Sequence, residues 1–274
     1  STSAKSVLPM LAMRGLATGL CAGCVVGLLR LSHDRAAARV ALWLEEWREV
    51  WWTVPIWFGV LVALAVILRR IVREEPLISG SGIPQTELAL AGRLSFTWWR
   101  VLLAKFLGSW LALFGGLALG REGPSIQMGG AVGAGFHALW RPAAPHALTG
   151  SPYVVAGAVA GLAAAFGAPA AGVLFAFEEM KSRRDTSLIV AACASAIGAH
   201  LMIRIVFGMG RILPFAGFEA PPLSSFWIVA LEGAVFGVLG VGYNKTLLWL
   251  HDREAGQTLI PDRWRALPPL LLAG

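Results

Sequence analysis

Ser81 is the first residue whose setting suggests chemistry, because it lies within the sequence Gly80-Ser81-Gly82-Ile83-Pro84. Glycines on both sides allow a tight backbone turn, and proline suits the first turn of a helix. A serine hydroxyl in such a turn offers a neutral hydrogen-bond donor to an anion. The segment therefore predicts a small anion cradle. On these five residues alone, the alternative is an ordinary Gly-Ser loop in front of a helix.

A glutamate occupies a second segment of this kind, Gly120-Arg121-Glu122-Gly123-Pro124. Pro124 predicts a helix start, and the free N–H groups of a helix N-terminus carry about half a positive charge that favours an anion. Glu122 stands directly in front of this expected start, so its carboxylate would compete with an anion for the same donors. Protonation would release it, which makes Glu122 a candidate proton-operated gate. The alternative is a capping residue that merely pairs with Arg121.

A third interruption, Ala164–Pro169, introduces a short apolar stretch that ends at Glu178 and Glu179. Basic residues follow at once and predict a cytoplasmic position for this end. Two adjacent carboxylates there would form a proton entry port. Equally, they would be surface charges paired with the neighbouring arginines.

The composition indicates that a membrane surrounds these segments. Of 274 residues, 57% are hydrophobic and 14% are charged, whereas a soluble domain carries about 25% charged residues. Three cysteines exclude a secreted disulfide scaffold, and the shortage of charge excludes a coiled coil or a disordered tail. The net charge of +7 indicates basic cytoplasmic loops rather than a nucleic-acid surface. We therefore expect an all-α polytopic membrane protein that binds no nucleic acid.

Apolar runs near the ~20 residues needed to cross a bilayer define the expected helices. The clearest run covers residues 50–68, with tryptophans at its start and arginines just after its end, which predicts that the arginine end is cytoplasmic. Residues 15–29 form an earlier run, interpreted as a membrane helix because no signal-peptide cleavage site followed by soluble sequence is found. Further apolar runs cover residues 95–119, 125–140, 153–177, 187–208 and 226–250.

Several of these runs are short or are broken by glycine and proline. Irregular backbone at membrane depth survives only where protein buries it or where it lines a cavity. Interrupted hydrophobic segments therefore point to the ion site of a transporter. Because residues 270–274 begin another apolar run, we expect the chain to be part of a longer membrane domain.

Taken together and in order, the segments GSGIP, GREGPSIQ and AAFGAPAAGVLFAFEEM resemble the CLC family of chloride channels and chloride/proton exchangers. The likeness extends through WWRVLLAKFLG to the end of the chain. It implies CLC-like inverted repeats with broken half-helices that point at the ion, and a homodimer with an anion pathway in each protomer. Residues 1–185 would be the first membrane repeat with the anion-site loops, and residues 186–274 the start of an incomplete second inverted repeat.

The resemblance also implies how the anion is held. Ser81 matches the serine that coordinates the central chloride, with Gly82, Ile83 and Gly123 completing the chloride-binding set. This serine argues against the fluoride-exporting branch of the family, which as a rule replaces it. Chloride is thus the expected substrate, and neither a cofactor nor a metal site is expected.

Two glutamates acquire roles from the same resemblance. Glu122 matches the external gate, and Glu179 matches the internal proton-transfer glutamate of exchangers. CLC channels generally lack an acidic residue at the internal position. The pair therefore indicates voltage-independent chloride/proton antiport, in the inner membrane of a bacterium.

Some features depart from the family pattern. Gln85 stands where many bacterial relatives have glutamate, and Gly167 stands where many have asparagine. The third filter segment, of GxFxP type, and the late pore-lining tyrosine are not found in this sequence.

Three other functions fit parts of the sequence. A passive CLC-type chloride channel is the alternative within transport, and a non-transporting fragment is another. An intramembrane serine protease would use Ser81 as nucleophile and His200 as base, although Ser79 stands where a G-x-S-G elbow requires glycine. His137 and His146 are interpreted as structural or interfacial histidines rather than as ligands.

Overall fold

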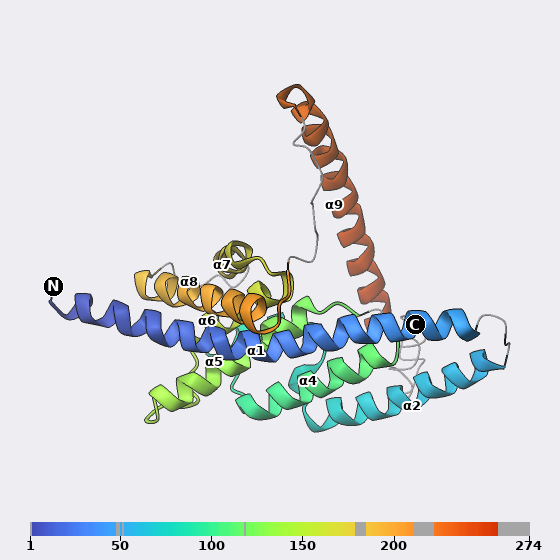
Figure 1. The fold of residues 1–274 in the computed structure, drawn as a ribbon, viewed down its shortest axis with the longest axis horizontal. Helices are drawn as coiled ribbons and strands as arrows, with labels where there is room; N and C mark the ends of the chain where they lie inside the picture. Colours follow the sequence, from blue (N-terminus) through green and yellow to red (C-terminus); the bar gives the residue numbers. More distant parts are fainter. Residues whose placement is uncertain are drawn as a thin grey trace. The chain divides into compact units, whose positions relative to one another are not determined.

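The computed structural model describes residues 2–47, 50, 52–117, 119–178, 185–210 and 222–256. Within these residues the regular secondary structure is entirely helical (Figure 1). The α-helices are α1 (Thr2–Trp47), α2 (Thr53–Glu74), α3 (Ile83–Leu90), α4 (Trp98–Phe114), α5 (Glu122–Trp140), α6 (Pro152–Phe166), α7 (Pro169–Glu178), α8 (Thr186–Leu201) and α9 (Phe226–Gly256). Short helical turns cover Pro76–Ile78 (η1), Met202–Val206 (η2, a π-helical turn) and Leu223–Ser225 (η3). The described residues up to 210 form one unit, and η3 with α9 belongs to a second.

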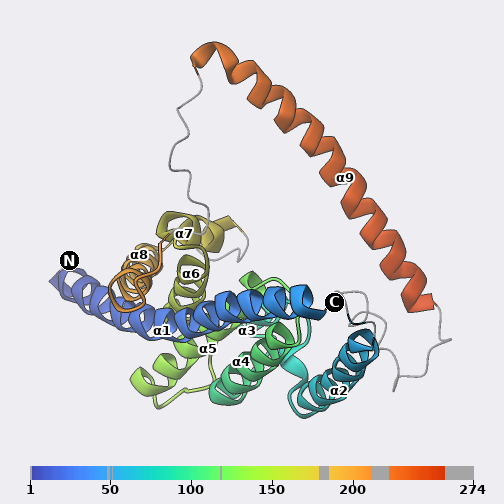
Figure 2. The same cartoon turned by 45° about the vertical axis from the view of Figure 1, so that its right-hand side comes forward.

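Helix α6 lies at the centre of the first unit. Every residue from Tyr153 to Ala165 is buried, and α1, α5, α7 and α8 pack around this helix (Figure 2). Glycines allow the contact with α5 to be close, because a Cβ on Gly129 would meet the backbone of Gly157. Small residues at such positions are the usual basis of helix association in membranes.

A second glycine-lined contact joins α1 to α8, which run side by side in both views (Figures 1 and 2). A Cβ on Gly19 would collide with the backbone of Ser195 in α8. The glycines of this face recur at every fourth position, which keeps them on one side of α1: Gly15, Gly19, Gly23 and Gly27. The glycine-rich composition therefore serves helix packing as well as helix interruption.

Four helical segments of the described residues are long and apolar enough to cross a membrane. They are Val7–Trp43, Thr53–Glu74, Thr186–Val206 and Phe226–Leu250. Each overlaps a run expected from the sequence, but the first is much longer than residues 15–29. The helix α1 continues past residue 29 because the next residue, Arg30, is buried against protein rather than exposed to lipid.

The interruptions expected at the Ser81 loop and at residues 164–169 are both helix boundaries. Gly82 precedes α3 with φ 89°, and Pro84 lies in the first turn of that helix. Gly167 ends α6 with φ 66°, and α7 begins at Pro169. Glycine adopts a positive φ without the strain that other residues incur. Local sequence therefore determines both breaks.

The expected boundary between repeats at residue 185 stays a prediction. Helix α8, which follows this boundary, packs against α1 and α6 within the first unit.

Candidate functional site

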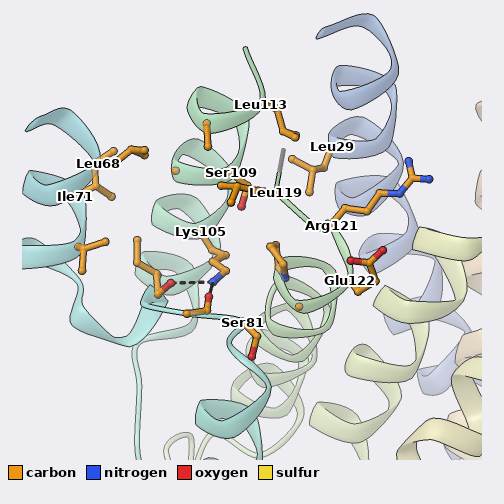
Figure 3. A pocket seen from close by; sticks show the side chains of 18 residues that line it. Leu29, Leu68, Ile71, Ser81, Lys105, Ser109, Leu113, Leu119, Arg121 and Glu122 are labelled. Carbon is orange, nitrogen blue, oxygen red and sulfur yellow. Dashed lines mark hydrogen bonds between the residues drawn. The ribbon is translucent and has the colours of Figure 1, made fainter. Parts of the chain in front are cut away.

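Ser81 and Glu122 line the same cavity, which has a volume of about 580 Å³. Its walls come from α1, α2 and α4 and from the chain segments that lead into α3 and α5 (Figure 3). Most of the lining is apolar, and its polar side chains are Ser81, Lys105, Ser109, Arg121 and Glu122. The structure thus brings together the two residues that the sequence singled out in separate segments.

Gly123 brings these two segments into contact. A Cβ on Gly123 would lie 2.6 Å from the Ser81 carbonyl oxygen and 2.8 Å from the Ser81 Cβ. Real Cβ atoms do not approach that closely, so only glycine fits at this position. Because Gly123 lies in the first turn of α5 and Ser81 just precedes α3, the N-termini of both helices begin at this contact.

The Ser81 loop presents hydrogen-bond donors. The backbone N–H of Ile83 donates to Ser81 Oγ at 3.4 Å, so the hydroxyl oxygen acts as an acceptor and its hydrogen remains able to donate. The first N–H groups of a helix have no intrahelical acceptor. The predicted chloride set of Ser81, Gly82, Ile83 and Gly123 therefore consists of neutral donors and partial charges.

Gln127 supports this loop from α5. Its Nε2 donates to the carbonyl oxygen of Leu77 at 2.7 Å, and a Cβ on Gly82 would collide with its side chain. The left-handed turn at Gly82 is therefore packed directly against α5.

Glu122 is the first residue of α5 and not, as expected, the residue in front of the helix. Pro124 falls in the first turn instead of opening it, which is tolerated because the first N–H groups of a helix lack partners anyway. The Glu122 carboxylate extends back toward Gly120, since a Cβ on Gly120 would lie 2.6 Å from Glu122 Oε2. It thus remains at the positive end of the helix, where a negative charge is favoured.

Arg121 does not pair with Glu122 among the residues described. Its Nη1 forms an ion pair with Asp34 Oδ1 of α1 at 3.5 Å, and Figure 3 shows the Arg121 side chain extending toward α1. The interpretation of Glu122 as a cap that merely pairs with its neighbour is therefore not supported.

Lys105 had no predicted role, yet it lies in the wall of the cavity. Its Nζ donates to the carbonyl oxygens of Ile78 at 2.8 Å and Gly80 at 2.6 Å (Figure 3). The side chain is 5% exposed. It therefore fastens the backbone that leads into Ser81. A lysine inside the apolar run 95–119 was the available signal, because charged residues in membrane sequence are functional candidates.

The remaining candidates lie elsewhere. Glu179 is outside the described residues, and α7 ends at Glu178. His200 is not among the residues that line the cavity with Ser81, so the described structure does not bring the two residues of the protease alternative into one cavity. Nor does it contain a group of three or more histidine, cysteine or acidic residues suited to a metal ion.

His137 is a structural histidine, as interpreted from the sequence. It is buried, with Nδ1 at 2.8 Å from Ser151 Oγ and Nε2 at 3.2 Å from the carbonyl oxygen of Ala144. His146 is exposed and borders a separate polar cavity together with Glu75 and Arg100.

A family model described as voltage gated chloride channel matches residues 58–274. The chain belongs to this family. Its curated relatives in the CLC family include the H(+)/Cl(-) exchange transporter ClcA of Vibrio cholerae, 37% identical over 241 residues, which cover 85% of this chain and 51% of the relative. The ClcA transporter of Yersinia pestis is 35% identical over 248 residues, covering 84% of this chain and 49% of the relative. The chain thus spans about half the length of these relatives.

Solved structures of CLC proteins share the fold. A slow cyanobacterial Cl−/H+ antiporter matches with a TM-score of 0.79 and 29% identity, covering 96% of this chain and 61% of the antiporter. A eukaryotic CLC transporter matches with a TM-score of 0.74 and 20% identity, covering 96% of this chain and 48% of that protein, which supports the fold alone. The predicted CLC family, all-helical architecture and membrane location are confirmed. The roles of Ser81, Glu122 and Glu179 stay predictions.

Proposed function

We propose that this CLC protein carries out voltage-independent antiport of chloride and protons across a bacterial inner membrane. The main support for this proposal is that Ser81 and Glu122 line one cavity, at two helix N-termini that meet at the Gly123 contact. The names of the relatives, which are H(+)/Cl(-) exchange transporters, support the same reaction. No cofactor enters the proposal, and the active unit would be a homodimer.

Chloride would be held by the Ser81 hydroxyl and by the N–H groups of Gly82, Ile83 and Gly123, with Ile83 exchanging its long hydrogen bond to Ser81 Oγ for one to the anion. Neutral donors and helix N-termini attract an anion without the full charge of a lysine or arginine, so the anion is released again. Lys105 is a full cation in the wall of this cavity. Its hydrogen bonds to two carbonyl oxygens spread part of that charge into the backbone.

Glu122 would couple the two ions. As a carboxylate it competes with chloride for the donors at the start of α5. When it accepts a proton it becomes neutral, leaves these donors and allows chloride to take its place. When Glu122 loses the proton, its carboxylate returns to these donors and chloride leaves them. Glu179 would supply or remove the proton on the internal side, so that chloride and protons move in opposite directions.

Proton and chloride movement in proteoliposomes tests this role of Glu122. In Glu122→Gln the side chain cannot take up or release the proton, so passive chloride flux is expected to persist without coupled proton movement. Glu45→Gln, at an exposed position near the end of α1, is the matched control and should remain coupled. Proton movement that is still driven by chloride in Glu122→Gln would contradict the proposal.

Reversal potentials distinguish the exchanger from a passive channel. A proton gradient shifts the reversal potential of an exchanger and leaves that of a channel unchanged. Glu179→Gln should remove the shift; an unchanged shift would return Glu179 to a surface role. Absence of any chloride movement by the unmodified protein would favour the non-transporting alternative.

A further inference from the structure

Arg30 is a buried cation in α1, outside the cavity that holds Ser81. Its side chain is 6% exposed. Nη2 donates to the carbonyl oxygen of Gly210 at 2.7 Å, and Nη1 to that of Ala164 at 3.5 Å. Ala164 lies in the last turn of α6, where carbonyl oxygens carry partial negative charge. Two carbonyl groups offset only part of a full positive charge, so the guanidinium keeps a surplus.

Further charged and polar groups share this face of α1. His33 and Asp34 follow Arg30 by three and four residues, a spacing that places side chains on one face of a helix. Asp34 of α1 forms an ion pair with Arg121, which directly precedes α5. Arg30 and His33 each interact electrostatically with Arg121 and Asp34, and His33 also with Glu122. We refer to Arg30, His33, Asp34 and Arg121 as the α1 cluster.

The α1 cluster has buried nitrogens without hydrogen-bond partners in the described part of the chain. They are Arg30 Nε, His33 Nδ1 and Arg121 Nη1. Buried polar atoms are nearly always hydrogen-bonded, because an unpaired one forfeits its hydration. Arg121 Nη1 forms an ion pair with Asp34 at 3.5 Å, but this contact is not a hydrogen bond.

The net charge of the α1 cluster also favours the binding of an anion. Its two guanidinium groups face one carboxylate, Asp34, before the ionisation of His33 or Glu122 is counted. A monovalent anion would both balance the surplus charge and accept hydrogen bonds from the unpaired nitrogens. Because these atoms are buried, the anion must be small.

We infer that the α1 cluster is a second anion site, which borders the Ser81 cavity through Arg121 and lies next to Glu122. It binds a small inorganic anion such as chloride through Arg30 and Arg121. The inference rests on the proposed function, since it gives the transported anion a place beside the gate. Asp34 competes with the anion for Arg121 and thereby weakens its binding, which would keep the anion exchangeable.

Bromide located by its anomalous scattering tests the site directly. Crystals of the protein grown with bromide in place of chloride should show one peak within hydrogen-bond reach of Arg30 Nε and another at Ser81. A peak at Ser81 alone would overturn the second site and leave the proposed function standing. A peak at the α1 cluster alone would support the second site and count against the Ser81 site. No peak at either position would overturn both.

Chloride affinity, measured by calorimetry, provides an independent test. In Arg30→Gln one component of chloride binding should weaken by about tenfold, because a charge-assisted hydrogen bond contributes on the order of one decade in affinity. Arg30→Lys, which keeps the charge, should retain most of that affinity. Arg35→Gln, an exposed position on α1, is the control. Unchanged chloride affinity in folded Arg30→Gln would show that Arg30 only caps α6, and would overturn the inference.

Asp34→Asn keeps the inference testable if Arg30 variants do not fold. Asp34 is 55% exposed as a side chain, so its substitution should be tolerated. Removing its charge takes away the competitor for Arg121, and chloride affinity at this site should rise severalfold. An unchanged or lower affinity would contradict the anion site.

Discussion

A Cβ on Gly123 would lie 2.6 Å from the carbonyl oxygen of Ser81, so the backbone at the start of α5 touches the backbone that precedes α3. Neither segment alone could form a site with donors from two helices. The contact places Glu122, the neighbour of Gly123, on the cavity that Ser81 also lines. The competition proposed between a carboxylate and chloride depends on this approach.

Gly123→Ala should separate the two helix starts. The new methyl group must displace the Ser81 backbone, and overpacking of this kind costs about 1–3 kcal/mol in the free energy of unfolding. We expect a lower melting temperature and weaker chloride binding, measured by thermal unfolding and calorimetry. Gly59→Ala in α2 is the control, because a Cβ there meets nothing within 4 Å. Chloride binding as tight as in the unmodified protein would contradict the role of this contact.

Lys105→Met should loosen the loop in front of Ser81. Methionine has a similar length but cannot donate, so the carbonyl oxygens of Ile78 and Gly80 lose their partner. The hydrogen bond to Ile78 is buried, and a buried group left unpaired costs about 1–3 kcal/mol, whereas the partly buried Gly80 carbonyl can be hydrated instead. We expect reduced thermal stability together with weaker chloride binding, whereas Lys245→Met on exposed α9 should change neither. A stable variant with unaltered chloride affinity would show that the two hydrogen bonds do not position Ser81.

Ser81→Ala separates the hydroxyl from the backbone donors. Ser81 is exposed in this chain, and its Oγ accepts one long hydrogen bond, from Ile83, so folding should be unaffected. Chloride affinity should fall by about tenfold if the hydroxyl donates to the anion. Ser109→Ala removes another hydroxyl from the same cavity and should leave chloride binding intact. Equal effects of the two substitutions would deny Ser81 a special role.

The helix breaks could be predicted because glycine and proline act through local backbone geometry. The positive φ values at Gly82 and Gly167, and the helix that starts around Pro84, follow from single residues and their neighbours. The start of α5 was expected two residues too late. Proline is allowed throughout the first turn of a helix and does not specify which position of that turn it occupies.

The partners of Lys105 could not be predicted in the same way. An apolar run with one lysine indicates a buried charge but not its acceptors, which here are carbonyl oxygens of a different segment. The ion pair between Arg121 and Asp34 also joins distant parts of the chain. Contacts of this kind depend on how α1, α4 and α5 pack, and a single sequence without that packing contains no signal for them.

The spacing of glycines in α1 did contain a signal, which the interpretation of glycine as a helix breaker passed over. Glycines four residues apart in an apolar helix mark a face for close helix packing. Gly19 and its neighbours form that face toward α8. Glycine content therefore has two physical causes in this chain, and only the spacing distinguishes them.

Gly19→Ala tests the packing cause. A Cβ on Gly19 would collide with the backbone of Ser195, which cannot move aside as a flexible side chain does. Helices α1 and α8 must then separate, and overpacking of this size costs about 1–3 kcal/mol. We expect a lower melting temperature in thermal unfolding. Chloride affinity should change little below that temperature, because Gly19 does not line the cavity with Ser81.

The same substitution at Gly59 removes a glycine from a helix interior without a collision and should stabilise the protein by up to about 1 kcal/mol. If Gly19→Ala were equally stabilising, the close approach of α1 and α8 would be wrong.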